Sequence, residues 1–179
     1  MASTSCTRSS SVPSVVSSVP AVVSAPVVGP CVDTPLIWPG CKDWIVDAVA
    51  SHIPADATRL IDLFMGSGTV SLKLADRFQT VLMCDVNPDL VDFMRMALDA
   101  PETLIAKATP LFSAGMNGGD AYRKQRTLFN QGGRSRTPAR FLYLNRHCYG
   151  GMIRYNKKGG FNTDAGNRKS SVLQVENIR

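Results

Sequence analysis

Two glycines and an acid have the spacing of a nucleotide-binding sheet, and they are the residues whose chemistry is easiest to infer. Gly66 and Gly68 follow a short apolar run, and Asp85 ends the next one. A backbone without Cβ adopts left-handed dihedrals and lets a ligand approach the main chain closely. A carboxylate about 20 residues after such glycines, at the tip of the second strand, accepts hydrogen bonds from ribose hydroxyls. The pattern therefore predicts a ligand that contains adenosine.

The glycine pattern is incomplete, which leaves an ordinary tight turn as the alternative. Ser71 stands where the third glycine of G-x-G-x-x-G would lie, and no G-K-S or G-K-T step follows, so a phosphate-binding P-loop is excluded. The elements that must position the site are a strand over 60–64, a helix over 69–77 and a strand over 80–84. This order predicts a βαβ unit and an α/β fold.

A Trp and a Lys four residues apart precede this unit. Trp38 and Lys42 lie in the turn W-P-G-C-K, just before a helix predicted over 43–52. An indole ring offers a ligand a flat apolar wall and an ammonium group pairs with an anion, although a core Trp and a solvated Lys would look the same in sequence. Another helix is predicted to begin after Asn87, which is better explained as its cap than as a ligand contact.

Charge is divided unevenly along the chain. Residues 1–100 carry 6 Lys/Arg and 10 Asp/Glu, a net charge of −4, whereas residues 101–179 carry 14 and 4, a net charge of +10. An acidic half followed by a basic half indicates a polyanionic partner, with a solvated basic surface as the alternative. The segment 145–166 is dense in Asn, Arg, Tyr, Gly and Lys, which contact phosphates and base edges. A β-hairpin is predicted over 153–163.

The remaining composition limits the class of protein. With 44% hydrophobic residues and no apolar run of about 18 residues, the chain is expected to be a soluble domain with its own core and no membrane segment. Residues 1–34 are predicted to be a disordered Ser/Val/Pro-rich arm, and residues 167–179 a short polar tail. The odd number of cysteines and their lack of C-x-x-C spacing argue against a zinc site or a disulfide framework and favour the cytoplasm. These cysteines are Cys6, Cys31, Cys41, Cys84 and Cys148.

Three motifs in the first half resemble those of the Dam-like adenine-N6 DNA methyltransferase family. W-P-G-C-K at 38–42 resembles the family's W-A-G-G-K signature. D-L-F-M-G-S-G at 62–68 resembles its E-P-F-x-G-x-G cofactor loop, and C-D-V-N-P-D-L at 84–90 is similar to its D-I-N-x-D-L.

The most specific likeness lies in the basic half. F-L-Y-L-N-R at 141–146 is followed by R-Y-N at 154–156 and G-F-N at 160–162, in the family's order and spacing. With the first three motifs, the resemblance covers residues 35–166.

The resemblance implies a fold, a cofactor and a partner. The fold would be a partial Rossmann-like S-adenosylmethionine-dependent methyltransferase sheet over 35–100, joined to a mainly helical target-recognition domain over 101–166 that carries the β-hairpin. S-adenosyl-L-methionine would lie with its methionine end near Lys42 and its ribose at Asp85. The implied cofactor residues are Trp38, Lys42, Phe64, Gly66, Gly68 and Asp85. The residues implied to contact double-stranded DNA are Arg123, Asn145, Arg146, Arg154, Tyr155, Asn156, Lys157 and Lys158, and no metal is expected.

One motif of the family is missing from these 179 residues. The family's D-P-P-Y or N-P-P-Y holds a flipped adenine, and Asn87-Pro88 is the only Asn-Pro or Asp-Pro step in this sequence. The sequence therefore predicts no catalytic residue. The resemblance implies a truncated adenine methyltransferase with a GATC-like site, inactive alone or completed by a second chain or by self-association. Two alternatives stay open: a non-catalytic protein that binds S-adenosylmethionine or DNA, and a structural or interaction protein that reuses the relic fold.

Overall fold

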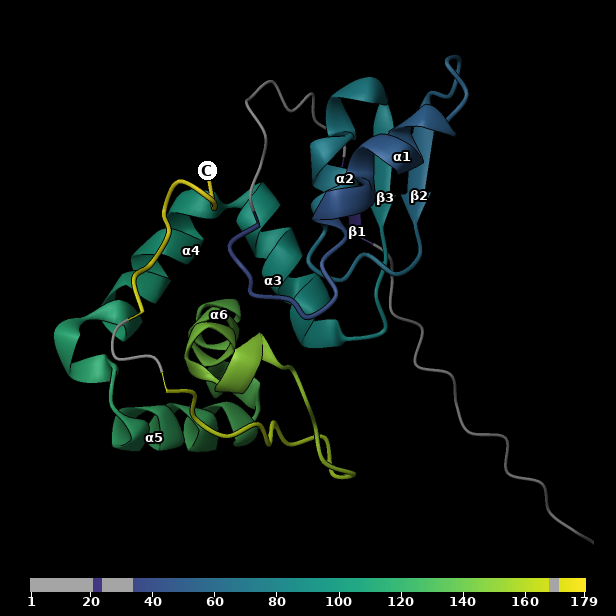
Figure 1. Ribbon diagram of the computed structural model, residues 1–179. Helices are drawn as coiled ribbons and strands as arrows, with labels where there is room; N and C mark the ends of the chain where they lie inside the picture. Colours follow the sequence, from purple (N-terminus) through teal and green to yellow (C-terminus); the bar gives the residue numbers. More distant parts are fainter. Residues whose placement is uncertain (1–20, 24–33, 168–170) are drawn as a thin grey trace, which may run out of the picture.

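The molecule has a small sheet at one end and a group of helices at the other, with α3 between them (Figure 1). The computed structural model describes residues 21–23, 34–167 and 171–179. Its longer helices are α3 (Pro88–Asp99), α4 (Pro101–Ala108), α5 (Gly119–Asn130) and α6 (Pro138–His147). The shorter helical segments are η1 (Asp43–Ile45), α1 (Val46–Ser51), α2 (Thr69–Lys73), η2 (Ala75–Arg77), η3 (Thr109–Phe112), η4 (Ala114–Met116), η5 (Gly133–Ser135) and η6 (Tyr149–Gly151).

The sheet contains the predicted βαβ unit. Strands β2 (Arg59–Asp62) and β3 (Thr80–Met83) are parallel, and α2 lies between them in the sequence. Parallel neighbours need such a crossover connection, so the glycine turn and its helix are what bring the two strands together. These elements give the chain a mixed α/β fold.

A third strand corrects the prediction for the N-terminal arm. Strand β1 (Ala21–Val23) pairs antiparallel with β3 and occupies the edge of β3 that β2 leaves free. Disorder was therefore the wrong prediction for residues 21–23. The prediction for 1–20 and 24–33 lies outside the described residues.

Two helices begin with the same capping device. Asn87 Oδ1 accepts hydrogen bonds from the N–H groups of Asp89 at 3.1 Å and Leu90 at 3.4 Å, and a proline at the first position fixes the backbone of α3. Thr137 precedes α6, and its Oγ1 likewise accepts a hydrogen bond from the Arg140 N–H in the first turn of that helix. The capping interpretation of Asn87 is thus confirmed.

Helix α6 forms the centre of the helical group, surrounded by α3, α4 and α5 (Figure 1). Its residues 141–145 are almost completely buried, including three consecutive large side chains, Phe141, Leu142 and Tyr143. The Phe141 ring packs on that of Phe93 of α3, with centroids 5.9 Å apart. This contact joins the helical group to the helix that follows the sheet. Within the described ranges, each helix is too short or too polar to cross a lipid bilayer.

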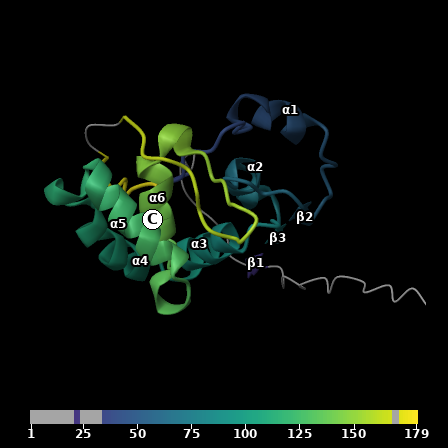
Figure 2. The same ribbon diagram turned by 90° about the horizontal axis from the view of Figure 1, so that it is seen from below.

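The predicted β-hairpin over 153–163 does not form strands. Tyr155 and Phe161 make one isolated antiparallel bridge, and the residues between them form a compact loop. Two backbone hydrogen bonds flank this bridge, from the Asn156 N–H to the Gly160 carbonyl and from the Asn162 N–H to the Arg154 carbonyl, both at 2.9 Å. The Asn156 side chain accepts hydrogen bonds from the N–H groups of Lys158 and Gly160, which closes the loop locally. We call residues 156–160 the basic turn. Figure 2 shows the segment that carries it running from α6 to the start of α3.

Candidate functional site

Three of the predicted cofactor residues lie together at the carboxyl ends of β2 and β3. Gly66 has a φ of +52°, and a Cβ at this position would lie 3.0 Å from Trp38 Nε1, so both the backbone and the indole ring require glycine. The Gly66 N–H donates to one oxygen of Asp85 at 3.1 Å, and the Asn87 N–H donates to the other at 2.9 Å. Indole, glycine turn and acid therefore form one contiguous site.

Two cavities meet at Trp38, which lines both. The larger cavity, of about 700 Å³, is lined mainly by residues 38–42 and 60–67. The smaller cavity, of about 400 Å³, takes part of its wall from Trp38 and Val86 and part from the segment 153–159. Asp85 lines neither cavity, but its two hydrogen-bond donors, Gly66 and Asn87, line one each.

The glycine turn is fixed by packing and by one buried hydrogen bond. Gly68 has a φ of +77°, and a Cβ there would lie 2.9 Å from Met94 Cε. Ser71, which stands at the place of the third glycine, is fully buried, and its hydroxyl donates to Asp62 Oδ2 at 2.7 Å. The serine therefore ties α2 to the end of β2, which accounts for this departure from the glycine pattern.

The other two predicted cofactor residues line the larger cavity and are exposed. Lys42 Nζ donates to the carbonyl of Gly40 at 2.7 Å, which leaves its remaining protons available to an anion. Phe64 is 87% exposed. Both side chains are therefore accessible to a ligand in this cavity.

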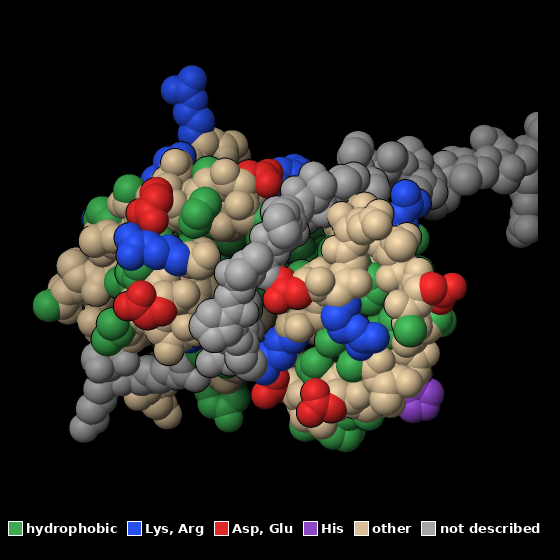
Figure 3. All heavy atoms as spheres, turned by 90° about the horizontal axis from the view of Figure 1, so that it is seen from above, with side chains coloured by type: hydrophobic (Ala, Val, Ile, Leu, Met, Phe, Trp, Pro, Cys, Tyr) green, Lys and Arg blue, Asp and Glu red, His purple; other side chains and the backbone are tan. Residues whose placement is uncertain are grey.

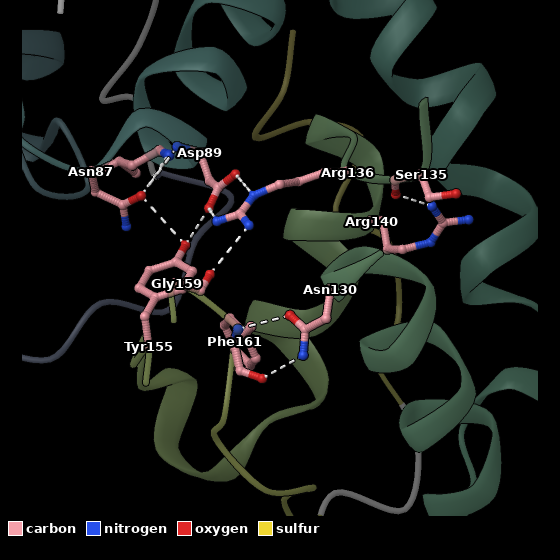
Figure 4. A network of polar contacts seen from close by, with 10 residues as sticks. Asn87, Asp89, Asn130, Ser135, Arg136, Arg140, Tyr155, Gly159 and Phe161 are labelled. Carbon is pink, nitrogen blue, oxygen red and sulfur yellow. Dashed lines mark hydrogen bonds and ion pairs between the residues drawn. The ribbon is translucent and has the colours of Figure 1, made fainter. Parts of the chain in front are cut away.

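A buried carboxylate joins the cofactor motif to the basic turn, as Figure 4 shows. Asp89, in the first turn of α3, accepts hydrogen bonds from Arg136 Nε and Nη2, both at 2.7 Å. The Tyr155 hydroxyl donates to the same carboxylate at 2.5 Å and lies 3.4 Å from Asn87 Oδ1. We call Asn87, Asp89, Arg136 and Tyr155 the Asp89 cluster.

The chemistry of the Asp89 cluster keeps its donors protonated. Burial, together with the hydrogen bond to Asp89, raises the pKa of Tyr155 well above its usual value, so its hydroxyl remains a donor. The hydrogen bonds to Asp89 also raise the pKa of Arg136. The Arg136 guanidinium lies over the ring of Phe129 at 4.8 Å and over that of Tyr155 at 5.5 Å, which adds cation–π attraction.

The predicted DNA residues fall into exposed and buried groups. The exposed ones are Arg123, Arg154, Asn156, Lys157 and Lys158. Arg123 pairs with Asp120 on its own helix, α5. Asn156, Lys157 and Lys158 belong to the basic turn, and Arg154 lies two residues before it. Figure 3 shows a face on which basic and acidic side chains are interspersed, so the basic surplus is not gathered there.

Two predicted DNA residues bond to other parts of the protein. The Tyr155 hydroxyl is directed to Asp89, and Arg146 Nη1 lies 3.4 Å from the carbonyl of Pro35. Both side chains are partly buried. Their bonds connect the basic half of the chain to the cofactor half.

The prediction that Asn145 contacts DNA is wrong. Its side chain has 0% exposure and therefore no surface that a duplex could reach. Its Oδ1 accepts from the Ile37 N–H at 2.9 Å, and its Nδ2 donates to the carbonyls of Ile37 at 2.8 Å and Gly151 at 3.0 Å. The amide thus fastens the segment that carries Trp38 to the end of α6. Its role in this structure is to position the segment that carries Trp38.

Sequence reasoning missed two exposed side chains at these surfaces. Val86 is 94% exposed and lines the smaller cavity, and its position directly after Asp85 at the strand tip was the available signal. Tyr149 is 64% exposed on the segment between α6 and the basic turn, where an aromatic next to cations is typical of nucleic-acid contacts. In the described part of the chain, no three His, Cys, Asp or Glu side chains gather closely enough to hold a metal ion.

Curated relatives of the chain are bacterial and phage DNA methylases. The DNA adenine methylase of Vibrio cholerae serotype O1 is 36% identical over 145 residues, which cover 80% of this chain and 51% of the relative. That of Serratia marcescens is 34% identical over 147 residues, covering 80% and 52%. The DNA N-6-adenine-methyltransferase of Escherichia phage P1 is 32% identical over 143 residues, covering 79% and 18%. The chain spans about half the length of the bacterial relatives.

The family model of the D12 class N6 adenine-specific DNA methyltransferases matches residues 38–179. The match begins at Trp38 and takes in the glycine turn, Asp85, the Asp89 cluster and the basic turn. The chain therefore belongs to the D12 class of N6 adenine-specific DNA methyltransferases.

Proposed function

We propose that this chain is the cofactor-binding and target-recognition part of an adenine-N6 DNA methyltransferase, and that it binds S-adenosyl-L-methionine and double-stranded DNA at a GATC-like site. The observation that carries the proposal is the convergence of Trp38, Gly66 and Asp85 where the two cavities meet. In this proposal β2, α2 and β3 are the first unit of a Rossmann-like sheet. When bound, the cofactor supplies an electrophilic methyl group.

The residues present fit this cofactor. Each oxygen of Asp85 accepts one backbone N–H and keeps capacity to accept a ribose hydroxyl. Trp38 and Val86 offer apolar walls for an adenine ring in the smaller cavity, and Lys42 offers a cation for the methionine carboxylate in the larger one. The cavity volumes of about 700 and 400 Å³ lie in the range of about 300–1,000 Å³ that is usual for small-molecule sites.

Calorimetry with S-adenosylhomocysteine, the reaction product, tests the cofactor site. The full chain is expected to bind it, and Asp85→Ala is expected to weaken binding at least about tenfold, because a hydrogen bond to a charged group contributes about 1.5–3 kcal/mol. Asp92→Ala is the matched control, since Asp92 lies on the outer face of α3 with its side chain 64% exposed. Absence of heat with the wild-type chain would contradict the proposal and favour a structural protein that reuses the fold.

The basic turn is the proposed DNA contact. Arg154, Lys157 and Lys158 are exposed and placed on one short segment, and Tyr149 presents an aromatic ring before it. Phosphate contacts release counterions, so duplex affinity is expected to fall steeply as salt rises. The face drawn in Figure 3 mixes acidic with basic side chains, which would weaken its attraction for DNA. We therefore propose the segment 149–158 as the surface that contacts DNA.

The outer edge of β2 is a third proposed contact. In the described residues this edge has no partner strand, and Ile61 and Leu63 beside it are more than half exposed. Such an edge pairs readily with another chain. We propose that further strands join here, from a second chain or by self-association.

Methyl transfer by the 179-residue chain alone is not expected. No D-P-P-Y or N-P-P-Y sequence is present to hold an extruded adenine and polarise its amino group. Tritium transfer from labelled S-adenosylmethionine to duplex DNA containing GATC should stay at the level of a protein-free control. Incorporation that grows with protein concentration and is lost in Asp85→Ala would show that this chain carries its own catalytic group.

A further inference from the structure

We propose that the Asp89 cluster couples the two proposed binding sites. An occupied smaller cavity holds the basic turn in its docked position, and DNA bound to the docked turn in return tightens the hold on the cofactor. Tyr155 and Arg136 are positioning residues in this scheme and touch neither ligand's reacting atoms. The inference rests on the proposed function, because it requires that both ligands bind.

The buried Phe161 ring, which packs on that of Phe129 with centroids 6.1 Å apart, and three hydrogen-bonded attachments hold the basic turn against the rest of the molecule. One isolated bridge, between Tyr155 and Phe161, replaces the ladder of a hairpin. The hydrogen-bonded attachments outside the loop are the Tyr155 hydroxyl on Asp89, Arg136 Nη1 on the Gly159 carbonyl at 3.2 Å, and the Asn130 side chain on the Phe161 backbone (Figure 4). Two of these three attachments depend on Asp89, since the same carboxylate orients Arg136.

Hydrogen bonds of the Asn87 side chain and backbone link the backbone of Asp89 to the carboxylate of Asp85, the acid proposed to bind the ribose. The Asn87 N–H donates to Asp85 at 2.9 Å, and the Asn87 side chain accepts from the Asp89 N–H at 3.1 Å. Asp85 in turn accepts from Gly66 in the cofactor loop. A single residue, Asn87, thus stands between the acid proposed to bind the cofactor and the acid that holds the turn.

Coupling requires that the protein bind the ligand more tightly when the basic turn is docked than when it is not. The lining of the smaller cavity provides this difference. Trp38 and Val86 belong to the cofactor motif, whereas Ile153, Tyr155 and Gly159 belong to the segment that carries the turn. A ligand in this cavity contacts both groups only while the turn is docked. Because the docked state offers more contacts, it binds the ligand more tightly, and the ligand shifts the equilibrium toward it.

The test measures duplex affinity of the full chain by fluorescence anisotropy, with and without saturating S-adenosylhomocysteine. A coupling of about tenfold is expected, within the usual range of about 5- to 150-fold. Tyr155→Phe keeps the ring that lines the smaller cavity and removes only the hydroxyl that reaches Asp89, so the ratio of duplex affinities with and without S-adenosylhomocysteine should fall to less than about twofold. By linkage, titrating S-adenosylhomocysteine with and without DNA must give the same ratio.

Two control variants separate coupling from general damage. Tyr143→Phe removes the same atom from a buried tyrosine whose hydroxyl donates to the Met116 carbonyl at 2.7 Å, away from the Asp89 cluster, and should keep the full ratio. Lys157→Ala with Lys158→Ala should weaken DNA binding equally with and without S-adenosylhomocysteine. Hydrogen exchange gives a readout without DNA: the amides of Lys158 and Gly160, which bond to Asn156, should exchange more slowly when S-adenosylhomocysteine is present.

The outcomes distinguish this inference from the proposed function. If the wild-type chain binds both ligands independently, or if Tyr155→Phe keeps the wild-type ratio, the coupling is overturned and the proposed function stands. If the chain binds neither ligand, both are overturned. A ratio lost in Tyr155→Phe and kept in Tyr143→Phe supports the coupling.

Discussion

Replacing Asn145 with alanine is expected to lower the free energy of unfolding by about 4 kcal/mol, since each buried polar group left unpaired costs about 1–3 kcal/mol. The substitution leaves the Ile37 N–H, the Ile37 carbonyl and the Gly151 carbonyl without the amide that satisfies them. It also opens a cavity in a fully buried position. Urea denaturation should show a lower midpoint with an unchanged slope.

Asn162→Ala is the matched control for this prediction. Asn162 is partly exposed, and its side chain accepts one hydrogen bond, from Arg154 Nε at 3.1 Å. Its loss should change the free energy of unfolding by no more than about 0.5 kcal/mol. Equal effects of the two substitutions would mean that the Asn145 amide does not hold the Trp38 segment as the structure indicates.

Replacing Asp89 with alanine is expected to lower the free energy of unfolding by about 3 kcal/mol, the lower end for a broken buried ion pair because Arg136 keeps some contact with water. The Arg136 side chain is 30% exposed and that of Asp89 9%. Without the carboxylate, the guanidinium and the Tyr155 hydroxyl lose their acceptor in a largely apolar setting. Urea or thermal denaturation measures the loss.

A double-mutant cycle measures how much of the lost free energy of unfolding comes from the Asp89–Arg136 pair. Arg136→Met in the Asp89→Ala background should restore part of the stability, with a coupling energy of about 1–3 kcal/mol between the two positions. The control pair is Asp92 and Arg95 on the outer face of α3, 3.6 Å apart and exposed, for which about 0.5 kcal/mol or less is expected. If the two cycles give the same coupling, the buried bidentate geometry has no energetic consequence.

The parts of the fold that the sequence predicts are those that local chemistry decides. Gly66 and Gly68 both take positive φ values, which few other residues tolerate, so their spacing alone indicates the turn. Asn87 followed by Pro88 caps a helix through bonds to the next few residues. In each case the partners lie within the motif itself, and the motif can be read without the rest of the chain.

The parts that sequence reasoning misses depend on distant partners. Asn145 lies in a segment of cations and amides. The residues next to it in the sequence do not indicate whether its side chain is buried against the protein or contacts DNA. Tyr155 was assigned to DNA for the same reason, although its hydroxyl bonds to Asp89, 66 positions earlier. Strand β1 comes from a low-complexity arm and acquires its structure by pairing with β3. The predicted hairpin is reduced to one antiparallel bridge, and the Asn156 side chain closes the loop between its two sides.

The bond between Ile37 and Asn145 spans 108 positions, which has a consequence for a chain that leaves the ribosome N-terminus first. At about 5–20 residues per second, translation of that interval takes about 5–20 s. The βαβ unit can assemble early in this period. The segment that carries Trp38, however, lacks its hydrogen-bond partner Asn145 until the end of α6 emerges. The nascent protein therefore fixes the Trp38 segment only after α6 has been synthesised.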